Sequence, residues 1–325
     1  MDDHAELISK VLVLDNNIDN LNKIKAFCDN NNLVGLKTHE ENVMAVLKSN
    51  VEMGAILLSE DYGGCPMSGI VLAREIHDIR PELPIILRRE HNETLIDLPE
   101  RDQMIFSAAY TIDNISKLRE VIKESIFSLV YPNVLVRGIT EMTINALISQ
   151  FKDIKVETET PYIVRDRIIY GEVFSLIPLE SSWCRGYMML QTEEEAMMDL
   201  VKTEKTYLSA DDTNFRNLDH VLGEITNLIW GTFKSRFIAE KDKVGLFNTQ
   251  VPIMVNHQHK YISFGSDDPQ LCFKYTMTDE QNPQKRPLVI YQRFVFNLNW
   301  SPDDFKENQN ASFDELVESG ELEMF

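Results

Sequence analysis

Short apolar runs alternate with stretches of helical spacing along the first 130 residues of the chain. The runs that predict buried strands are KVLVLD, GAILLS, LPIILR and IFSAAYT. Helical spacing predicts helices in IDNLNKIKAFCDNN, NVMAVLKS, GIVLAREIHDI and KLREVIKESIFSLV, and GLKTHE predicts a weaker strand. Because strands and helices alternate, this part predicts a doubly wound parallel sheet with helices on both faces. A site in such a sheet forms at the carboxyl ends of its strands.

After the turn residues YPN, the pattern changes to long helices and neighbouring strands. NVLVRGITEMTINALISQF predicts a long helix, EEEAMMDLVKTE a short one, and the segment from about 217 to 238 another long one. Strands are predicted in DIKVETE, IIYGEVFSLIPL, RGYMMLQ, VPIMVN, QLCFKYTM and LVIYQRFVFNL. Helices next to runs of strands predict an α+β domain with an antiparallel sheet. We therefore expect one domain at residues 1–130, a second at 131–300 and an acidic tail at 301–325.

Acidic residues dominate the tail, and this composition predicts a solvated end. Apolar residues recur among the acids, so a second interpretation is a docking segment. Its contact residues would be Phe313, Leu316, Val317 and Phe325. The sequence does not decide between these two roles.

The charge balance of the chain limits the partners that it can bind. Its 325 residues include 32 Lys and Arg against 52 Asp and Glu, for a formal net charge of -20. Nucleic acids and anionic membranes require basic patches, so we expect neither as a partner, whereas a protein that presents cationic groups is compatible. The sequence has no apolar run near about eighteen residues, and its first segment is acidic. We therefore expect no transmembrane helix, no signal peptide and a cytoplasmic location.

The cysteines of the chain lack the CxxC or Cys/His spacing of metal sites and redox motifs. Isolated cysteines of this kind are usually buried free thiols in a reducing cytoplasm. We expect this state for Cys28, Cys65, Cys184 and Cys272.

The helix predicted near residues 217 to 238 has an apolar face and an unusual polar face. A helical wheel places its apolar residues within about 140°, which predicts a stripe that faces a core: Leu218, Val221, Leu222, Ile225, Leu228, Ile229 and Phe233. Asn227 points away from this stripe, and Glu224 is its neighbour at i, i+3 spacing. His220, Gly231 and Lys234 lie around Asn227, with Gly223 beside them. Glycine and asparagine weaken a helix, so small residues beside a carboxylate and an amide suggest room for another molecule.

The segment LDHVLGEITNLIWG resembles the CheC/CheX/FliY phosphatases of bacterial chemotaxis, and the resemblance extends over residues 133 to 300. Their signature is an acid or hydroxyl residue, three further positions, then ExxN, then a glycine four positions later. Glu224, Asn227 and Gly231 match it. His220 departs from it, although Asp219 is adjacent. The opening helix ITEMTINALISQF has no ExxN, which resembles CheX rather than CheC.

The resemblance implies hydrolysis of an aspartyl phosphate on a separate, CheY-like response-regulator receiver. Asn227 would position the attacking water, and Glu224 would pair with the partner's lysine. His220, Gly223, Gly231 and Lys234 would contact that partner. The chain would need no cofactor of its own, since Mg²⁺ would come with the partner's site, and it would form a homodimer. The alternative is a non-catalytic adaptor or scaffold for two-component signalling proteins.

The stretches KVLVLDNN, GAILLSEDYGGCPMSGIVLAREI and LPIIL resemble the receiver domain of response regulators, over residues 9 to 130. Receivers bind Mg²⁺ with an acidic pair after the first strand, and here the pair is Asp15 and Asn16. The phosphoacceptor position falls on Ser59 or, by another alignment, on Asp61, with Glu60 between them.

The remaining receiver positions also depart from the family. The position of its Thr or Ser falls on Arg88 or Arg89, and the position of its lysine near Thr111. One certain carboxylate, added arginines and no lysine predict weak Mg²⁺ binding. We therefore expect a degenerate receiver that serves interaction, regulation or dimerisation, with Asp15 and Asp61 as weak remnants of a metal site.

Overall fold

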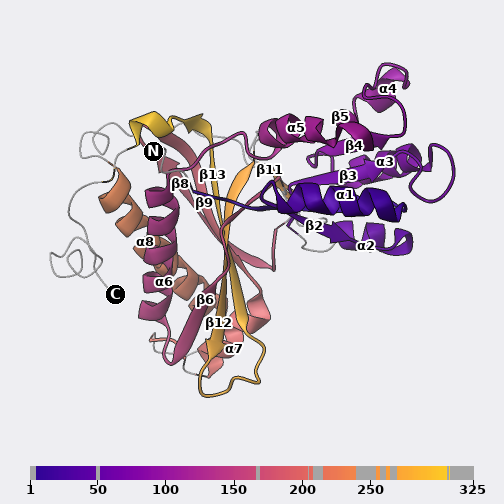
Figure 1. Ribbon diagram of the computed structural model, residues 1–325. Coiled ribbons are helices and arrows are strands. Elements are labelled where there is room, and N and C mark those ends of the chain that lie inside the picture. Colours follow the sequence, from indigo (N-terminus) through magenta and orange to yellow (C-terminus); the bar gives the residue numbers. More distant parts are fainter. Residues whose placement is uncertain are drawn as a thin grey trace.

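The chain forms two sheets of different kinds (Figure 1). The computed structural model describes residues 5–48, 52–165, 169–203, 205–207, 215–238, 254–256, 261–263, 269–305 and 307. The first sheet is parallel and five-stranded, and the second is antiparallel and six-stranded. This confirms the predicted fold class, a doubly wound parallel sheet followed by an α+β part. We use the names N-terminal domain for residues 1–130 and C-terminal domain for 131–300, and the boundary itself remains a prediction.

The N-terminal sheet has the strand order β2-β1-β3-β4-β5, and all its neighbours are parallel. Every residue of β3 and β4 is buried, as expected for central strands covered on both faces. The strands are β1 (Ser9–Leu14), β2 (Leu33–Lys37), β3 (Ala55–Ser59), β4 (Ile85–Arg89) and β5 (Phe106–Thr111). The helices are α1 (Ile18–Asp29), α2 (Val43–Lys48), α3 (Ser68–Ile79), α4 (Glu100–Gln103) and α5 (Leu118–Ser125), with 3-10 turns at Glu40–Asn42 and Ile112–Lys117.

Two features of this domain differ from the sequence prediction. The last helix was expected to continue to Val130, but α5 ends at Ser125. Ile126 is fully buried in the core, and the N–H of Phe127 reaches back to the carbonyl of Ile122, so the chain turns off the helical path. The one-turn helix α4 carries too few residues for a periodic pattern, and the sequence did not predict it.

The C-terminal sheet has the order β6-β12-β13-β9-β8, with β7 also paired to β12. Its strands are β6 (Ile154–Thr158), β7 (Tyr162–Val164), β8 (Val173–Glu180), β9 (Cys184–Thr192), β12 (Gln270–Asp279) and β13 (Leu288–Trp300). A separate hairpin consists of β10 (Met254–Asn256) and β11 (Tyr261–Ser263), so the first half of the predicted strand VPIMVN lies outside the described residues. The helices are α6 (Asn133–Gln150), α7 (Glu194–Lys202) and α8 (Phe215–Phe237), and a 3-10 turn spans Pro302–Asp304.

The strand predicted from IIYGEVFSLIPL starts later than expected. Gly171 has a φ of 68°, and a Cβ on it would lie 2.0 Å from the carbonyl oxygen of Thr192. Only glycine fits this left-handed, crowded position, so the extended strand begins after it, at Val173. The short strand β7 was not predicted, because three residues are too few to show alternation.

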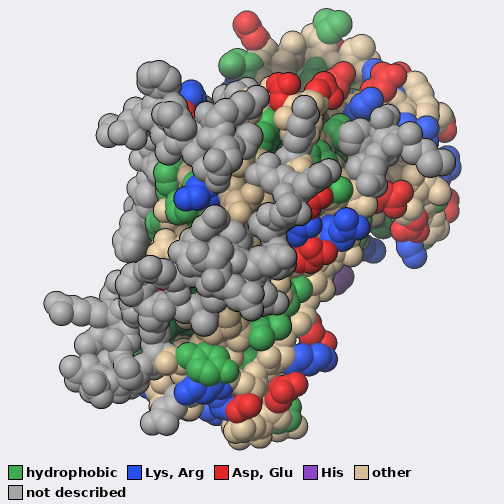
Figure 2. All heavy atoms as spheres, turned by 90° about the vertical axis from the view of Figure 1, so that its left-hand side faces the viewer, with side chains coloured by type: hydrophobic (Ala, Val, Ile, Leu, Met, Phe, Trp, Pro, Cys, Tyr) green, Lys and Arg blue, Asp and Glu red, His purple; other side chains and the backbone are tan. Residues whose placement is uncertain are grey.

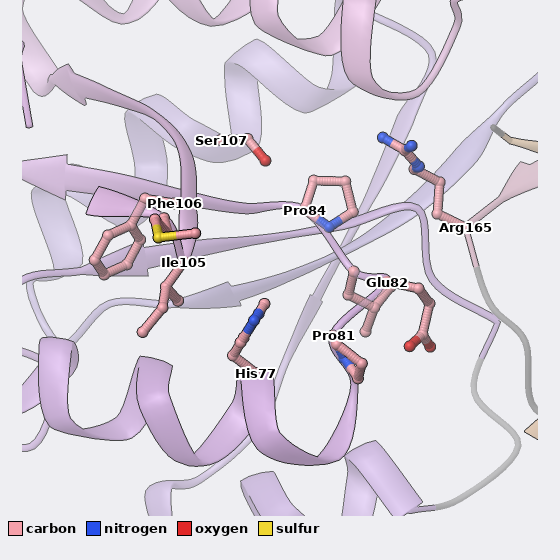
Figure 3. Close-up of a pocket in the computed structure, with 10 residues that line it drawn as sticks. His77, Pro81, Glu82, Pro84, Ile105, Phe106, Ser107 and Arg165 are labelled. Carbon is pink, nitrogen blue, oxygen red and sulfur yellow. The ribbon is translucent and has the colours of Figure 1, made fainter. Parts of the chain in front are cut away.

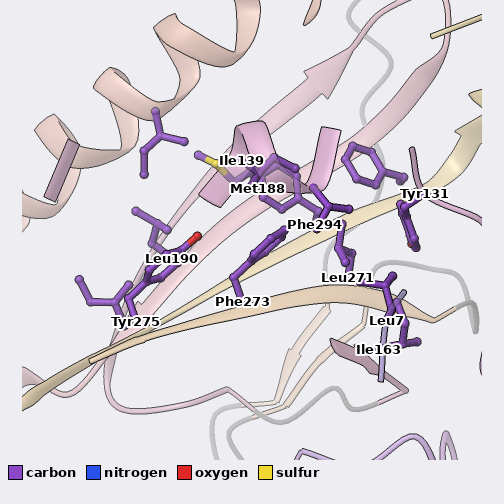
Figure 4. Packing of buried hydrophobic residues seen from close by; sticks show 14 of the residues in the cluster. Leu7, Tyr131, Ile139, Ile163, Met188, Leu190, Leu271, Phe273, Tyr275 and Phe294 are labelled. Atoms are coloured by element: carbon purple, nitrogen blue, oxygen red, sulfur yellow. The ribbon is translucent and has the colours of Figure 1, made fainter. Parts of the chain in front are cut away.

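Helices α6 and α8 lie side by side across one face of the C-terminal sheet (Figure 1). Beneath these two helices, aromatic and aliphatic side chains of β9, β12 and β13 pack against apolar residues of α6 (Figure 4). All the apolar residues predicted to form the stripe of α8 are buried: Leu218, Val221, Leu222, Ile225, Leu228, Ile229 and Phe233. Each such side chain contributes about 1.5–3 kcal/mol when it is fully buried, so the stripe fixes which face of α8 points outward.

Backbone pairing joins the two domains at the amino ends of the N-terminal strands. The N–H of Ile163 in β7 donates to the carbonyl of Ile8 at 2.9 Å, and Ser9 Oγ donates to the carbonyl of Ile163 at 2.7 Å. Arg165 continues this junction, since its N–H donates to the carbonyl of Met53 at 3.1 Å. The carboxyl ends of the same strands therefore point away from the C-terminal domain (Figure 1).

Several expectations about single residues can be checked directly. Cys28, Cys184 and Cys272 are buried free thiols as predicted, but Cys65 is exposed because it lies in the loop between β3 and α3.

The first residues of the tail are not fully solvated, since the ring of Phe305 packs edge-on against Trp183 with centroids 5.0 Å apart. The tail residues named as docking contacts, 313 to 325, lie outside the described residues. No helix in the described part of the chain has the length and apolar character needed to cross a membrane.

Candidate functional site

The outward face of α8 presents a carboxylate and an amide one turn apart. Asn227 is exposed, as expected from its place opposite the apolar stripe, and the neighbouring Glu224 is half-buried. Within the described part of the chain, neither side chain forms a hydrogen bond or an ion pair. Lys234, which was predicted to lie on the same face, is exposed further along the helix. Among the residues that the structure describes, carboxylate and amide thus have no competing partner.

Two glycines flank this pair on α8, Gly223 and Gly231. A Cβ on Gly223 would meet nothing within 4 Å, so the chain's own packing does not require a glycine there. Gly231 is half-buried on the same side of the helix. His220 lies within α8, but its side chain is outside the described residues. Figure 2 views the molecule from the side of α6 and α8, and acidic and basic side chains are interspersed over the described surface.

The C-terminal end of α8 is fixed by contacts with both neighbouring elements. Trp183 Nε1 donates to the carbonyl of Phe237 at 2.9 Å and so satisfies one of the free carbonyls at the helix end. Arg236 binds Glu141 of α6 at 3.0 Å and Glu307 at 2.7 Å. These bonds fix the rotation of α8, which determines where its polar face points.

The exposed side of α6 differs from that of α8 in the state of its carboxylate. It also carries a carboxylate and an amide, Glu141 and Asn145, but four residues apart rather than three. The carboxylate of Glu141 is already bound by Arg236, and Arg137 lies 3.6 Å away. Glu224 has no such partner among the described residues, so the two helices differ in the availability of their carboxylates.

A guanidinium fills the site at the carboxyl ends of the N-terminal strands. Arg88 Nε donates to Asp15 Oδ2 at 2.5 Å, Nη2 to Ser59 Oγ at 2.6 Å and Nη1 to Glu90 Oε1 at 2.6 Å. Arg88 and Ser59 are each 3% exposed, and Asp15 is 4% exposed. The register explains this arrangement, because Ser59 and Arg88 are directly paired in β3 and β4.

The other predicted receiver positions have partners of their own. Arg89 points to the other side of β4 and binds Glu60 at 2.9 Å. Thr111, at the lysine position, donates to Glu93 at 3.1 Å. Asp61 lies in the loop beyond β3, where it accepts a bond from the N–H of Met67 at 2.9 Å. Of the two candidate acceptor positions, Ser59 thus contacts Arg88, and Asp61 holds its own loop.

Close packing fixes the loop that contains these residues. A Cβ on Gly69, in the first turn of α3, would lie 1.9 Å from the carbonyl oxygen of Ser59. The N–H of Gly69 donates to the carbonyl of Glu60 at 2.9 Å. The absence of a side chain at residue 69 therefore allows α3 to start directly against the end of β3.

The residues present do not fit the Mg²⁺ ion that a receiver fold implies. Mg²⁺ requires nearly octahedral oxygen ligands, with carboxylates as the main protein donors. The carboxylate of Asp15 is already bonded to a buried cation, and the next residue is an asparagine. Across the described residues, no group of three or more His, Cys, Asp or Glu is arranged to hold a metal ion.

A cavity of about 420 Å³ lies where the two domains meet. Its walls come from the end of α3, the loop before β4 and the start of β5, and Arg165 closes the side toward the C-terminal domain (Figure 3). The guanidinium of Arg165 also donates to the carbonyl of Ser125 at 3.1 Å. This cavity lies at the amino ends of the strands, so it is separate from both sites described above.

Comparison with known proteins gives distant similarities in fold. No model of a protein family matches the chain, and no curated protein matches it. A chemotactic CheC-like protein from Shewanella oneidensis MR-1 is similar at 17% identity and a TM-score of 0.34, over 50% of this chain and 98% of that one. A mutant receiver domain of the histidine kinase CKI1 from Arabidopsis thaliana is similar at 18% identity and a TM-score of 0.30, over 38% of this chain and 93% of that one.

A third similar structure belongs to a longer protein. NtrX from Brucella abortus, in complex with ADP, has 17% identity and a TM-score of 0.29 over 36% of this chain. The chain spans only 26% of the length of NtrX. Similarities at this level describe the fold and assign no activity.

Proposed function

We propose that the protein is a phosphatase that hydrolyses the aspartyl phosphate of a separate response-regulator receiver. The observation that carries this proposal is the available pair of Glu224 and Asn227 on the outward face of α8. The buried stripe of α8 supports it, because that stripe holds the pair in a fixed orientation toward solvent. The resemblance of LDHVLGEITNLIWG to chemotaxis phosphatases supplies the reaction class.

In this proposal Asn227 orients the attacking water. Its amide oxygen accepts a hydrogen bond from the water while its NH₂ group donates to the substrate, which places the water in line with the phosphorus. Phosphoryl transfer depends mainly on positioning and electrostatics, so no strong base is required on α8. The Mg²⁺ and the lysine that neutralise the phosphoryl group belong to the partner.

Glu224 fixes the docking register by pairing with the lysine of the partner receiver. Glu224 lies one turn from Asn227 on the same side of the helix. The Cβ atoms of two residues at this spacing are about 5–6 Å apart. A half-buried carboxylate loses less solvation on pairing than a fully exposed one, and an interfacial charge pair selects one orientation. Gly223, Gly231, Lys234 and His220 are the further partner contacts that we propose.

The substrate receiver is a separate molecule in this proposal. The N-terminal domain is attached through the amino ends of its strands, so its carboxyl edge points away from α8. In addition, Thr111 stands at the position of a receiver's lysine, so Glu224 would lack that partner there. Contact between the chain's own receiver-like domain and Asn227 is therefore not part of the mechanism.

Phosphate release from a purified, phosphorylated receiver in the presence of Mg²⁺ tests the proposal. We expect the full chain to accelerate release and Asn227→Ala to reduce the catalysed rate by about a hundredfold, because the water loses its positioning group. Asn145→Ala is the matched control, since Asn145 is also an exposed asparagine on a helix of the same domain. Equal rates for the two variants would contradict the assigned role of Asn227.

A non-catalytic adaptor is the second candidate, and the Arg88 site favours it. Because the Arg88 guanidinium fills its pocket, the receiver-like domain would keep one structure rather than switch on phosphorylation. Such a domain suits a scaffold. An adaptor would form a stable complex with the partner that Asn227→Ala leaves intact, without accelerating phosphate release. Co-sedimentation of the complex, measured alongside phosphate release, separates the two functions.

We also propose a homodimer of the C-terminal domain. The outer strands of its sheet are β6 and β8, and an unpaired strand edge can accept a strand from a second copy. Analytical ultracentrifugation of the full chain measures this association, and a purely monomeric protein at micromolar concentration would contradict it.

A further inference from the structure

An open groove of about 410 Å³ lies between helix α1 and strand β2 of the N-terminal domain. Its walls are mainly aliphatic, with Ile18, Leu21 and Ile24 contributed by α1 and Leu33 and Leu36 by β2. Ile18 is 73% exposed, so the chain's own packing does not cover this apolar surface. The groove is separate from the Arg88 site and from the face of α8.

Strand β2 forms one edge of the N-terminal sheet. It pairs with β1 on one side, and no described strand pairs with its other side. Val34, Gly35 and Lys37 are exposed along it. An unpaired edge offers backbone N–H and C=O groups to an added strand, and a neighbouring groove can receive alternate side chains of that strand. Edge and groove together therefore suit an extended segment.

Gly35 forms part of the floor of the groove. The register pairs Gly35 with Val11 and Lys37 with Val13, so these β2 residues lie on the face of the sheet that α1 covers. A Cβ on Gly35 would meet Cys28 Sγ and Val13 Cγ2 at 3.7 Å, which is an ordinary contact distance. Packing therefore does not require a glycine at this position, and the missing side chain deepens the groove.

Two lysines border the groove. Lys25 of α1 and Lys37 of β2 are exposed, and neither side chain forms an ion pair or a hydrogen bond with another described residue. Asp29 is the one acid among the lining residues, so the lining carries two positive charges against one negative charge. A lysine on an edge strand opposes pairing with a neutral or basic strand and favours an acidic one. The preferred occupant is therefore an extended segment with both apolar and acidic residues.

The acidic tail of the chain contains a segment with this pattern. Residues 321–325 read ELEMF, so Leu322 and Met324 alternate with glutamates. Such alternation is typical of a half-buried strand, with the two apolar side chains on one face. Residues 308–325 contain no lysine or arginine, and they lie outside the described part of the chain. In composition and spacing, this segment is complementary to the groove.

We propose that the segment from Glu321 to Phe325 of a second copy of the chain adds as a strand to the unpaired edge of β2. Its Leu322 and Met324 side chains enter the groove beside Gly35, and its glutamates are attracted by the two lysines of the rim. Main-chain hydrogen bonds to β2 supply affinity, and the alternate apolar side chains select the register. This inference concerns the N-terminal domain and the tail, and it does not depend on the proposed phosphatase activity.

The place where the tail leaves the described part of the chain favours a second copy. Glu307, the last described residue, is bound to Arg236 near the C-terminal end of α8. Figure 1 shows α8 and α1 on opposite sides of the molecule. The segment of the same copy would have to cross the whole molecule before it reached β2, whereas the segment of a neighbouring copy would not.

Binding of a fluorescent peptide with the sequence of residues 308–325 tests the groove. The titrated protein is the full chain with Leu322→Asp and Met324→Asp, so that its own tail does not compete. We expect saturable binding, and the same two substitutions in the peptide should weaken it at least about tenfold, because both apolar anchors are lost. Fluorescence anisotropy measures the affinities. No saturable binding, or equal affinity for a scrambled peptide, would overturn the proposal.

Substitutions in the groove test the same contact from the other side. Gly35→Val fills the floor at an ordinary contact distance, and we expect the peptide affinity to fall about tenfold while circular dichroism shows an unchanged fold. Lys37→Glu should lower the affinity several-fold and reduce its dependence on salt. Lys123→Glu is the matched control, because Lys123 is an exposed lysine on α5. Unchanged affinity for Gly35→Val would overturn the groove as the site, and equal effects of the two lysine variants would overturn the role of the rim.

Disulfide formation between Asn22→Cys and Met324→Cys identifies the copy that supplies the segment. Asn22 is exposed and lines the groove, and Cys65→Ser removes the exposed native thiol. We expect covalent dimers or larger oligomers on a non-reducing gel, and none when Lys123→Cys replaces Asn22→Cys. A disulfide between these positions within a monomer would overturn the second copy as the source. No disulfide at all would overturn the docking of the tail.

Discussion

Ser175 Oγ and Thr226 Oγ1 lie 2.5 Å apart, and this hydroxyl pair ties the middle of α8 to the outer strand β8. Thr226 is 5% exposed and also donates to the carbonyl of Leu222 at 2.7 Å. It directly precedes Asn227, so the bond is formed one residue away from the outward-facing amide. The hydroxyl pair therefore fixes the rotation of α8 at the point where the proposed site lies.

Replacing either hydroxyl alone should destabilise the C-terminal domain. Thr226→Val keeps the shape of the side chain but leaves Ser175 Oγ without this partner, and we expect a loss of about 1–2 kcal/mol in the free energy of unfolding. Ser175→Ala should have a similar effect. The double variant should be closer to the wild type than the sum of the single variants, because both polar groups are then removed. Urea unfolding of the four proteins measures this coupling, and strict additivity would argue against the bond.

Removing the guanidinium of Arg88 should destabilise the N-terminal domain strongly. Arg88→Ala leaves the buried carboxylate of Asp15 without its cation, and breaking such a pair costs about 3–5 kcal/mol. Arg101→Ala is the control, because the side chain of Arg101 is 72% exposed and its nearest acid is 3.7 Å away. That variant should change the free energy of unfolding by less than about 0.5 kcal/mol. Chemical denaturation followed by circular dichroism distinguishes the two results.

The Arg88 arrangement also predicts how the N-terminal domain responds to a phosphoryl donor. Incubation of the full chain with Mg²⁺ and acetyl phosphate should add no phosphoryl group, because a guanidinium occupies the site and binds Ser59, one of the two candidate acceptor positions. Intact-mass spectrometry measures the product, with an ordinary receiver as the positive control. A phosphorylated peptide that contains Asp61 would show instead that the loop acid acts as an acceptor.

The four thiols should differ sharply in reactivity. Burial raises the pKa of Cys28 to about 11 and that of Cys184 to about 12, so neither forms appreciable thiolate at neutral pH. Cys272 is buried as well, whereas Cys65 is exposed. Because the thiolate is the nucleophile, a maleimide at pH 7 should label the native chain at Cys65 alone. Peptide mapping checks this, Cys65→Ser should abolish the labelling, and rapid labelling of Cys28 would mean that the domain opens readily.

Periodic features of this fold could be predicted from the sequence, and features that depend on distant partners could not. The stripe from Leu218 to Phe233 repeats at helical spacing over several turns, and all its members are buried. The role of Arg88 depends on Asp15, which is 73 residues away and meets it only because β1, β3 and β4 lie in one sheet. The sequence signal for this ion pair was the pair Arg88 and Arg89 at the end of one predicted strand, with acidic residues at the ends of two other predicted strands. The half-burial of Glu224 depends on its neighbours in space, which a helical wheel does not contain.

Replacing Glu224 should affect docking rather than chemistry if the proposed function is correct. Glu224→Gln keeps the size of the side chain but removes the charge that pairs with the partner's lysine. We expect KM for the phosphorylated receiver to rise about fivefold, with a weaker dependence on salt, while kcat changes little. Asn227→Ala should show the opposite behaviour, a loss in kcat at nearly constant KM, because its contact forms only with the attacking water.

Glu195→Gln is the matched control for Glu224→Gln, because Glu195 is an exposed glutamate on the helix α7 of the same domain. It changes the net charge by the same amount, so any general electrostatic effect on association should appear in both variants. Steady-state phosphate release at two ionic strengths measures all three proteins. An equal rise in KM for Glu224→Gln and Glu195→Gln would mean that Glu224 acts only through the overall charge of the chain. A loss in kcat confined to Glu224→Gln would instead place this carboxylate in the chemical step.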